Sequence, residues 1–448
     1  MTSGPNIASE FLRHFGDRHL WFSRAVVLAF GAASGASIVA FVWLTDVALH
    51  GFFALQARAW WVPLAWTPFC SGAIVWFTRR LAPAAGGSGI PQVMAEVGRG
   101  TERVGVALVS LRISLAKMVL TAWGLLAGLS IGREGPSVQI AAGVMHSARD
   151  WISSRTASSP RGLLVAGGAA GIAAAFNAPL AGVMFAIEEL SRGAEERSNG
   201  LLVSAIVLAG LVAVSMYGDA SYFGRIQVKE VGAGLVLPGL LVAVASGVAG
   251  GLFARVLIRS FSVNQRDVFS RIRQARPVLF AVFCGLLVAA IGVASGGATF
   301  GSGYAHTRAM LTVGEQESMT YFFLKAIATW LTAWSGVPAG IFAPSLAIGA
   351  ALGNDISLLT GYGHAPTLIA LGMAGFLAGA TQAPLTAFII VMEMVDGHEM
   401  VLSLMACAVI ASSLSRVVSL PLYATLAKGY DSGVRDSGMA APSPQSQG

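Results

Sequence analysis

The chain has 448 residues, of which 55% are hydrophobic and only 11% are charged. A soluble globular protein carries about 25% charged residues, and the mean hydropathy here is +0.69. This composition excludes an ordinary soluble enzyme and predicts a chain that lies in a lipid bilayer. The formal net charge of +7 comes without a nucleic-acid-binding motif, so we expect no nucleic-acid partner.

The first element in chain order is a polar, basic segment over residues 1–24. It has no convincing signal-peptide cleavage site, so we expect it to stay on the cytoplasmic side. Apolar runs follow, and those over 26–43 and 201–216 come close to the roughly 20 residues that cross a bilayer. Many other runs are shorter and are cut by Gly or Pro, which predicts a multi-span protein with broken helices.

Two loops between the apolar runs are rich in arginine. Basic loops stay on the cytoplasmic side of a membrane, so we place both loops inside, with the N-terminus. One loop spans 149–161. The other spans 255–276 and sets six arginines against the single acid Asp267: Arg255, Arg259, Arg266, Arg271, Arg273 and Arg276.

The sequence also contains an internal repeat. Several residues match at a spacing of 208, and others further along the chain match at a spacing of 205. The pairs at 208 are Lys117 with Lys325, Gly132 with Gly340, and Pro136 with Pro344; those at 205 are Pro179 with Pro384 and Glu188 with Glu393. Matches in one order at nearly one spacing predict two similar halves of the chain.

We place the two halves at 25–217 and 232–428, joined by a polar linker at 218–231. The linker follows one inner loop and precedes the other, so an external linker is consistent with an odd number of spans in each half. That arrangement implies inverted topology, which in transporters points to a substrate site near the bilayer midplane.

Three breaks place Gly before Pro at the start of a new apolar run: "GSGIP" at 87–91, "GREGP" at 132–136 and "GIFAP" at 340–344. A helix that begins inside the membrane points free N–H groups and a positive dipole end at the midplane, where an anion binds. We expect the three helix ends to converge on one anion. Their N–H groups carry only partial charges, so they can bind the anion and release it, whereas a Lys or Arg in direct contact would hold it too tightly. The alternative is that the breaks are helix kinks or packing glycines.

Glu134 lies at the second break, directly after Arg133. A carboxylate inside a membrane is costly and therefore marks function. At a helix N-terminus its charge is stabilised, so it can occupy an anion position, and it can leave that position once protonated. A salt bridge to Arg133 is the weaker alternative, because neighbouring side chains point in different directions. We predict that Glu134 is both gate and proton carrier.

These motifs resemble, in order and spacing, those of the CLC family of chloride channels and chloride/proton antiporters. The resemblance covers about 30–428. It implies an all-α membrane protein with two inverted-topology repeats of tilted and broken helices. It also implies a homodimer in which each subunit has its own pore, with chloride and protons as the transported ions.

The resemblance also implies roles for single residues. The Ser88 and Tyr423 hydroxyls correspond to those at the family's central anion, and the amides of Ile341 and Phe342 to those along the outer path. The full set of implied anion-binding residues is Ser88, Tyr423, Ile341, Phe342, Gly132, Arg133 and Gly135. Glu134 resembles the gating glutamate.

Glu189 resembles the inner proton-accepting glutamate of the antiporters, and family channels tend to lack an acid there. We therefore expect secondary active exchange of chloride for protons. A passive chloride channel, gated by voltage or pH, is the alternative. In that case Glu188 and Glu189 would only mark a helix end at the membrane surface.

Two positions bear on the anion path. Gln92 stands where the family often has an acid, so Lys117 lacks an obvious partner, with Glu96 as the remaining candidate. Ser88 stands where nitrate-preferring relatives carry proline, which favours chloride. The "GSGIP" motif together with Tyr423 argues against the fluoride-specific branch.

The tail over 429–448 is polar and is expected to be disordered. It is too short for the regulatory domains of many eukaryotic members, which favours a bacterial inner-membrane protein with both termini in the cytoplasm. No HExxH, CxxC or P-loop motif occurs, so we expect a transporter rather than an enzyme, with no metal site and no cofactor.

Overall fold

The computed structural model describes residues 18–99, 107–152, 159–191, 200–218, 222–223, 232–262, 267–314 and 317–437. Within these ranges the chain forms helices and one isolated backbone bridge, with no β-strand, which confirms the predicted all-α fold. Most of the expected N-terminal segment and linker, and the end of the tail, lie outside the described residues.

The helices of the first half are α2 (Arg18–Gln56), α3 (Val62–Leu81), α4 (Ile90–Arg99), α5 (Leu111–Leu126), α6 (Glu134–His146), α7 (Pro160–Phe176), α8 (Pro179–Phe185) with a π-helical turn (Ala186–Leu190), and α9 (Gly200–Tyr217). Those that follow are α10 (Val236–Phe261), α11 (Val268–Ala275), α12 (Pro277–Ala294), α13 (Tyr304–Thr312), α14 (Thr320–Trp334), α15 (Phe342–Thr360), α16 (Ala365–Thr381), α17 (Pro384–Met394), α18 (Val401–Val418) and α19 (Leu422–Ser437).

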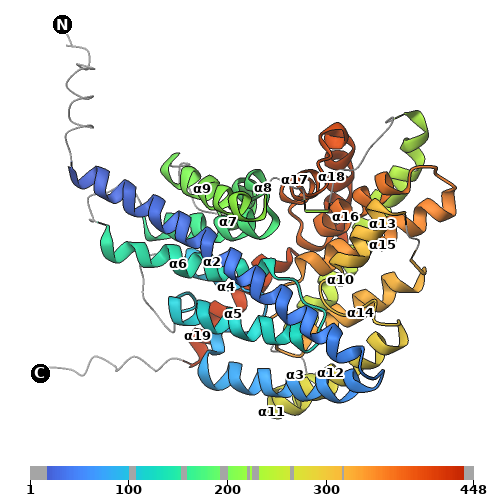
Figure 1. Ribbon diagram of the computed structural model, residues 1–448, viewed down its shortest axis with the longest axis horizontal. Helices are drawn as coiled ribbons and strands as arrows, with labels where there is room; N and C mark the ends of the chain where they lie inside the picture. Colours follow the sequence, from blue (N-terminus) through green and yellow to red (C-terminus); the bar gives the residue numbers. More distant parts are fainter. Residues whose placement is uncertain are drawn as a thin grey trace, which may run out of the picture.

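The two halves lie side by side. In Figure 1 the green helices α7, α8 and α9 lie at the upper left and the red helices α16, α17 and α18 at the upper right, while the blue helix α2 crosses below them to the lower right. Contacts between α3 and α12 and between α8 and α17 join the halves. The last helix, α19, returns to the first half and packs against α4. The start of α19 is thereby placed beside helices of both halves.

The helices of the two halves follow the same order and have the same kinds of ends. Asn177 ends α7 and Gln382 ends α16, both in the left-handed conformation, with φ angles of 54° and 61°. In each case Ala and then Pro follow, and Pro starts the next helix because its fixed φ suits the first helical turn. The repeat in sequence is therefore a repeat of helix boundaries.

Small residues allow the helices to approach closely. A Cβ on Gly349 in α15 would lie 2.3 Å from the carbonyl oxygen of Gly372 in α16, so only glycine permits this contact. Six of the described helical segments are long and apolar enough to cross a membrane: Leu20–Gln56, Gly200–Tyr217, Val236–Phe261, Pro277–Ala294, Phe342–Thr360 and His398–Val418. We therefore treat the protein as a multi-pass membrane protein.

Two expected boundaries fall inside helices. Helix α2 begins at Arg18, within the segment 1–24 that we set apart from the membrane halves. Helix α19 continues to Ser437, past residue 429 where we set the start of the tail. The helix continues because it packs against α4, and Arg99 of α4 donates a hydrogen bond of 3.3 Å to the Tyr430 carbonyl.

Candidate functional site

Two glycines related by the repeat, Gly132 and Gly340, face each other where the halves meet. The Gly132 N–H donates to the Gly340 carbonyl at 2.8 Å, and the Gly340 N–H donates to the Gly132 carbonyl at 3.1 Å. The two segments run antiparallel, as segments related by a twofold axis do. A Cβ on Gly340 would lie 2.5 Å from the Gly132 carbonyl oxygen, so this approach requires glycine.

Glu134 lies next to this pair of glycines. It is the first residue of α6, and its side chain is fully buried. Its Oε2 atom accepts a hydrogen bond of 3.2 Å from the Ala343 N–H, in the first turn of α15. The carboxylate therefore lies at the positive end of α15, where helices bind anions. The side chain thus occupies the kind of position that a diffusing anion would take.

Two buried hydroxyls lie close to this point. Ser88 precedes α4, and a Cβ on Gly135 would come within 2.5 Å of its Oγ atom. Tyr423 lies in the first turn of α19, and its ring stacks on Phe342 with the ring centroids 5.9 Å apart. Neither hydroxyl has a hydrogen-bond partner among the described residues. Because buried polar groups are normally paired, the two hydroxyls mark a place for a polar ligand.

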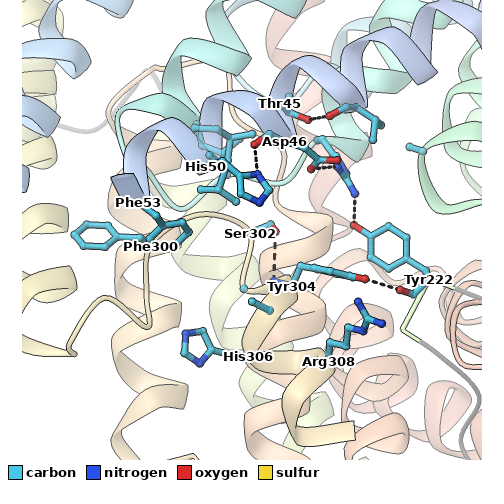
Figure 2. A pocket seen from close by; sticks show the side chains of 18 of the residues that line it. Thr45, Asp46, His50, Phe53, Tyr222, Phe300, Ser302, Tyr304, His306 and Arg308 are labelled. Atoms are coloured by element: carbon cyan, nitrogen blue, oxygen red, sulfur yellow. Dashed lines mark hydrogen bonds and ion pairs between the residues drawn. The ribbon is translucent and has the colours of Figure 1, made fainter. Parts of the chain in front are cut away.

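Two cavities approach Glu134, and the side chain lines neither of them. The first, which we call the Tyr423 cavity, has a volume of about 580 Å³ and is lined by Ser88, Ile341 and Tyr423, among others. The second, the Arg133 cavity, has a volume of about 610 Å³ and lies between α2 and α13 (Figure 2). Glu134 follows Arg133 and bonds to α15 just after Ile341, so it lies in the wall between the cavities.

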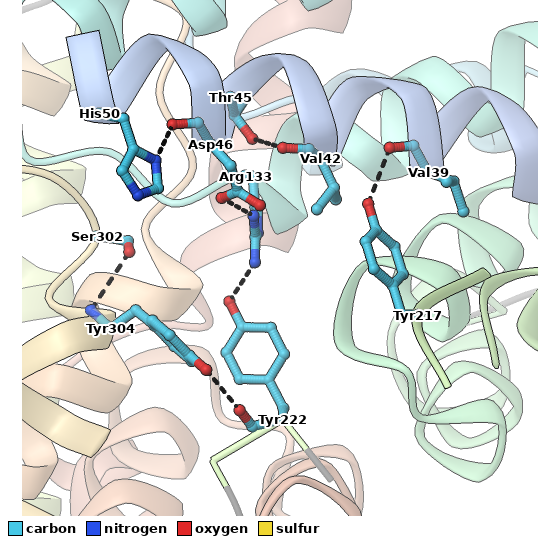
Figure 3. Close-up of polar contacts among 10 residues, drawn as sticks. All are labelled: Val39, Val42, Thr45, Asp46, His50, Arg133, Tyr217, Tyr222, Ser302 and Tyr304. Carbon is cyan, nitrogen blue, oxygen red and sulfur yellow. Dashed lines mark hydrogen bonds and ion pairs between the residues drawn. The ribbon is translucent and has the colours of Figure 1, made fainter. Parts of the chain in front are cut away.

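The Arg133 guanidinium makes its hydrogen bonds with residues other than Glu134. Its Nη1 donates to Asp46 Oδ1 and its Nη2 to the Tyr222 hydroxyl, both at 2.8 Å (Figure 3). The guanidinium stays close enough to the Glu134 carboxylate for the two charges to interact. Of the Arg133 groups, the backbone is therefore the part that lies beside the helix break, while the guanidinium faces the Arg133 cavity.

The two acids at the end of α8 have different surroundings. Glu189 is 1% exposed, and its carboxylate is within electrostatic reach of the Tyr423 hydroxyl. Glu188 accepts hydrogen bonds from the Leu385 and Thr386 N–H groups at 3.0 and 2.7 Å, at the start of α17. Glu188 therefore has a structural partner in the other half, whereas Glu189 is buried and its charge acts on the Tyr423 hydroxyl.

Comparison with known proteins decides the family. The sequence model described as voltage gated chloride channel matches residues 70–416. The chain belongs to this family. Similar sequences include the H(+)/Cl(-) exchange transporter ClcA of Cronobacter sakazakii, which is 29% identical over 427 residues covering 88% of this chain and 87% of that protein. The protein of the same name from Citrobacter koseri is 30% identical, over 78% of this chain and 74% of its own.

Solved structures support the same fold. A slow cyanobacterial Cl-/H+ antiporter aligns with a TM-score of 0.76 at 23% identity, over 94% of this chain and 99% of its own. A CLC-type fluoride/proton antiporter aligns with a TM-score of 0.74 at 22% identity, over 90% of this chain and 97% of its own. The predicted CLC-like architecture is thereby confirmed for this family member.

The partner expected for Lys117 was wrong. Glu96 accepts from the Leu108 N–H at 3.2 Å and pairs with Arg99. The Lys117 ammonium instead donates to the Ala85 and Gly87 carbonyls at 2.9 and 2.6 Å. Buried charges are stabilised when their hydrogen bonds are satisfied, and two carbonyl groups, one just before the "GSGIP" motif and one at its first residue, satisfy this lysine without a carboxylate.

Gln92 holds the same loop from its other side. Its Oε1 accepts from the Gly89 N–H at 3.0 Å, and its Nε2 donates to the Gly86 carbonyl. A neutral amide can make both bonds because it carries a donor and an acceptor. The glutamine that departs from the family pattern is therefore part of what fixes Ser88 in place.

The sequence did not reveal the partners of Arg133. Asp46 and Tyr222 lie 87 and 89 residues away from it in the chain. An acid near the end of a long apolar helix was the one available signal, and it indicates Asp46 only. Nothing in the linker sequence distinguishes Tyr222 from an interfacial tyrosine.

Proposed function

We propose that this protein exchanges chloride for protons across a membrane by secondary active transport. The observation that carries the proposal is the position of Glu134: buried between two cavities, with its carboxylate on an N–H of α15. A protonatable group in the place of an anion couples the two ions, because protonation removes the charge that holds it there. The names of the ClcA relatives support the same reading, and we propose a transporter, not an enzyme.

Each site residue receives a role in this proposal. The Ser88 and Tyr423 hydroxyls donate to a chloride at the end of the Tyr423 cavity. Backbone N–H groups of Arg133, Gly135, Ile341 and Phe342 complete the path. Gly132 contributes through its pairing with Gly340, because its own N–H donates to the Gly340 carbonyl. Glu134 is the gate and the proton carrier, and Glu189 is the inner proton acceptor.

A passive chloride channel on the same fold is the alternative. Glu189 favours exchange, because it is buried within electrostatic reach of Tyr423 instead of standing at an exposed helix end. A carboxyl group there can pass protons towards Glu134 without leaving the low-dielectric interior, which an interfacial acid could not do.

We further propose the molecular setting. The membrane halves lie at 25–217 and 232–428 with inverted topology, the linker 218–231 is external, and both termini are cytoplasmic in a bacterial inner membrane. The protein forms a homodimer with one pore per subunit. The candidate contact surface is the apolar face of α9 and α18, on which Leu211, Leu402 and Val409 are exposed.

The deciding experiment reconstitutes the protein in liposomes, imposes a chloride gradient, and records external chloride and pH together. Proton movement against its own gradient is expected. It should vanish in Glu134→Gln, and in Glu189→Gln while chloride still moves. Glu399→Gln is the matched control, because Glu399 is exposed. Chloride efflux without proton movement in the wild type would establish the channel instead.

A further inference from the structure

Arg133 presents a problem for any anion path. A full positive charge stands next to Glu134, yet a cation in direct contact with chloride would hold the ion and slow its release. Arginine carries its donors in a rigid planar fork that suits anions well. The structure shows where these donors go: one arm meets Asp46 and another meets Tyr222, both at 2.8 Å.

The two partners come from different parts of the chain. Asp46 lies on α2, and its side chain is 50% exposed towards the Arg133 cavity, whereas that of Arg133 is only 15% exposed. Tyr222 belongs to the short described stretch between the two halves. In Figure 3 the guanidinium lies between the Asp46 carboxylate and the Tyr222 phenol.

Tyr222 is held independently of Arg133. The Tyr304 hydroxyl, from α13, donates to the Tyr222 carbonyl at 2.9 Å, and the two rings meet edge to face at 4.9 Å. The next residue, Phe223, donates its N–H to the Met394 carbonyl at 2.9 Å. The phenol that meets Arg133 is therefore fixed by the second half of the molecule.

We propose that Asp46 and Tyr222 are positioning residues that mask the Arg133 guanidinium, so that it draws chloride to the path without binding it tightly. The proposal rests on the proposed function. Asp46 offsets the charge, and Tyr222 takes a donor that would otherwise be free to meet an anion. Arg308 lines the same cavity, so a positive charge remains there to attract anions over a distance.

The masking predicts kinetic changes that differ from those of a variant whose structure is merely disturbed. Removing either mask frees a guanidinium donor for chloride at the mouth of the path. Chloride should then bind more tightly and leave more slowly, so the KM for chloride and the maximal rate should fall together. A variant that was merely disordered would lose rate with an unchanged or higher KM.

The test compares Tyr222→Phe and Asp46→Asn with the wild type in liposome chloride flux, over a range of chloride concentrations. Each variant should lower KM and maximal rate by about tenfold, the ratio that one hydrogen bond to a charged group supports. Tyr217→Phe is the matched control, because Tyr217 lines the same cavity but its hydroxyl donates to the Val39 carbonyl. It should leave both quantities unchanged.

A double variant isolates the guanidinium. Arg133→Gln combined with Tyr222→Phe should have the KM of Arg133→Gln alone, because no masked charge remains to be released. An unchanged or raised KM in Tyr222→Phe and Asp46→Asn overturns the masking, as does an equal effect of Tyr217→Phe. If Tyr222→Phe does not fold, Asp46→Asn decides by the same criterion. If the wild-type protein moved no chloride at all, the proposed function itself would be rejected. That result is distinct from failure of the masking, in which the wild type moves chloride but the variants do not lower KM.

Discussion

Glu188 and Glu393, which the internal repeat relates, each accept hydrogen bonds from the N-terminus of a helix in the opposite half of the molecule. Glu188, at the end of α8, accepts from the Leu385 and Thr386 N–H groups that begin α17. Glu393, at the end of α17, accepts from the Leu180 and Ala181 N–H groups that begin α8, at 3.1 and 2.7 Å. Glu188 thus caps the N-terminus of α17, and Glu393 caps the N-terminus of α8.

This reciprocal cap predicts a specific stability loss. Glu188→Gln and Glu393→Gln each remove a charge and one acceptor from a helix N-terminus, and each should lower the stability by about 1 kcal/mol. Thermal unfolding of the purified protein in detergent measures the effect. Glu399→Gln, at an exposed site, should leave the midpoint unchanged. A shift in only one of the two cap variants would contradict the symmetry of the arrangement.

The contact between Gly132 and Gly340 predicts that neither position accepts a side chain. A Cβ on Gly132 would lie 2.6 Å from the Glu134 carboxylate, and one on Gly340 would lie 2.5 Å from the Gly132 carbonyl oxygen. We expect Gly132→Ala and Gly340→Ala to cost about 1–3 kcal/mol of stability, as overpacking does, and to lower chloride flux at least tenfold. Flux and thermal unfolding are measured on the same preparations.

Gly98→Ala serves as the control for these variants, because nothing lies within 4 Å of a Cβ added there. Gly132→Ala has a further expected result. It should disturb proton coupling more than Gly340→Ala does, because its methyl group would displace the Glu134 carboxylate directly. Equal coupling in the two variants would count against a gating role for that carboxylate.

The features that the sequence predicted are those that depend on local pattern. Gly followed by Pro at 132–136 and 340–344 indicated helix starts, and α6 and α15 begin there. The repeat spacing related Gly132 to Gly340, and the two pair in space. Local rules succeed here because a helix N-terminus is defined by the residues within one turn of it.

The sequence did not predict the contacts between segments that lie far apart in the chain. The two carbonyls that bind Lys117 carry no side-chain signal, so a carboxylate partner was sought in error. The hydrogen bonds of Arg133 join α2, the second break and the stretch 222–223, and no periodicity in the sequence encodes such contacts. Backbone acceptors and single long-range pairs become visible only once the helices are placed.

Lys117 and Lys325 provide a matched pair for the next prediction. Each is fully buried, and Lys325 donates to the Thr299 and Gly301 carbonyls at 2.9 and 2.8 Å, as Lys117 does to its own loop. Lys117→Met and Lys325→Met should each cost about 2 kcal/mol, because buried carbonyls lose their donors. Lys117→Met alone should also raise the KM for chloride several-fold, since its loop holds Ser88. Chloride flux and thermal unfolding distinguish the two, and an equal change in KM would contradict the assignment of Ser88.

The buried hydroxyls of Ser88 and Tyr423 allow a test that separates binding from folding. Neither has a hydrogen-bond partner of regular geometry among the described residues, and beyond their mutual interaction they contribute a desolvation cost in the protein without an anion. Ser88→Ala and Tyr423→Phe should therefore leave the stability in chloride-free buffer unchanged or raise it by about 1 kcal/mol. With chloride bound, the lost donor should weaken affinity by about tenfold.

Chloride titration by calorimetry and thermal unfolding with and without chloride measure both effects on one sample. The wild type should be stabilised by chloride, because a ligand that binds the folded state shifts unfolding by mass action. Each hydroxyl variant should lose most of that shift. A control is Thr121→Val, which removes a buried hydroxyl that also lacks a described partner but lies on α5, and which should keep the chloride shift. If Ser88→Ala and Tyr423→Phe kept it too, the anion would lie elsewhere along the path, held by the helix N-termini alone.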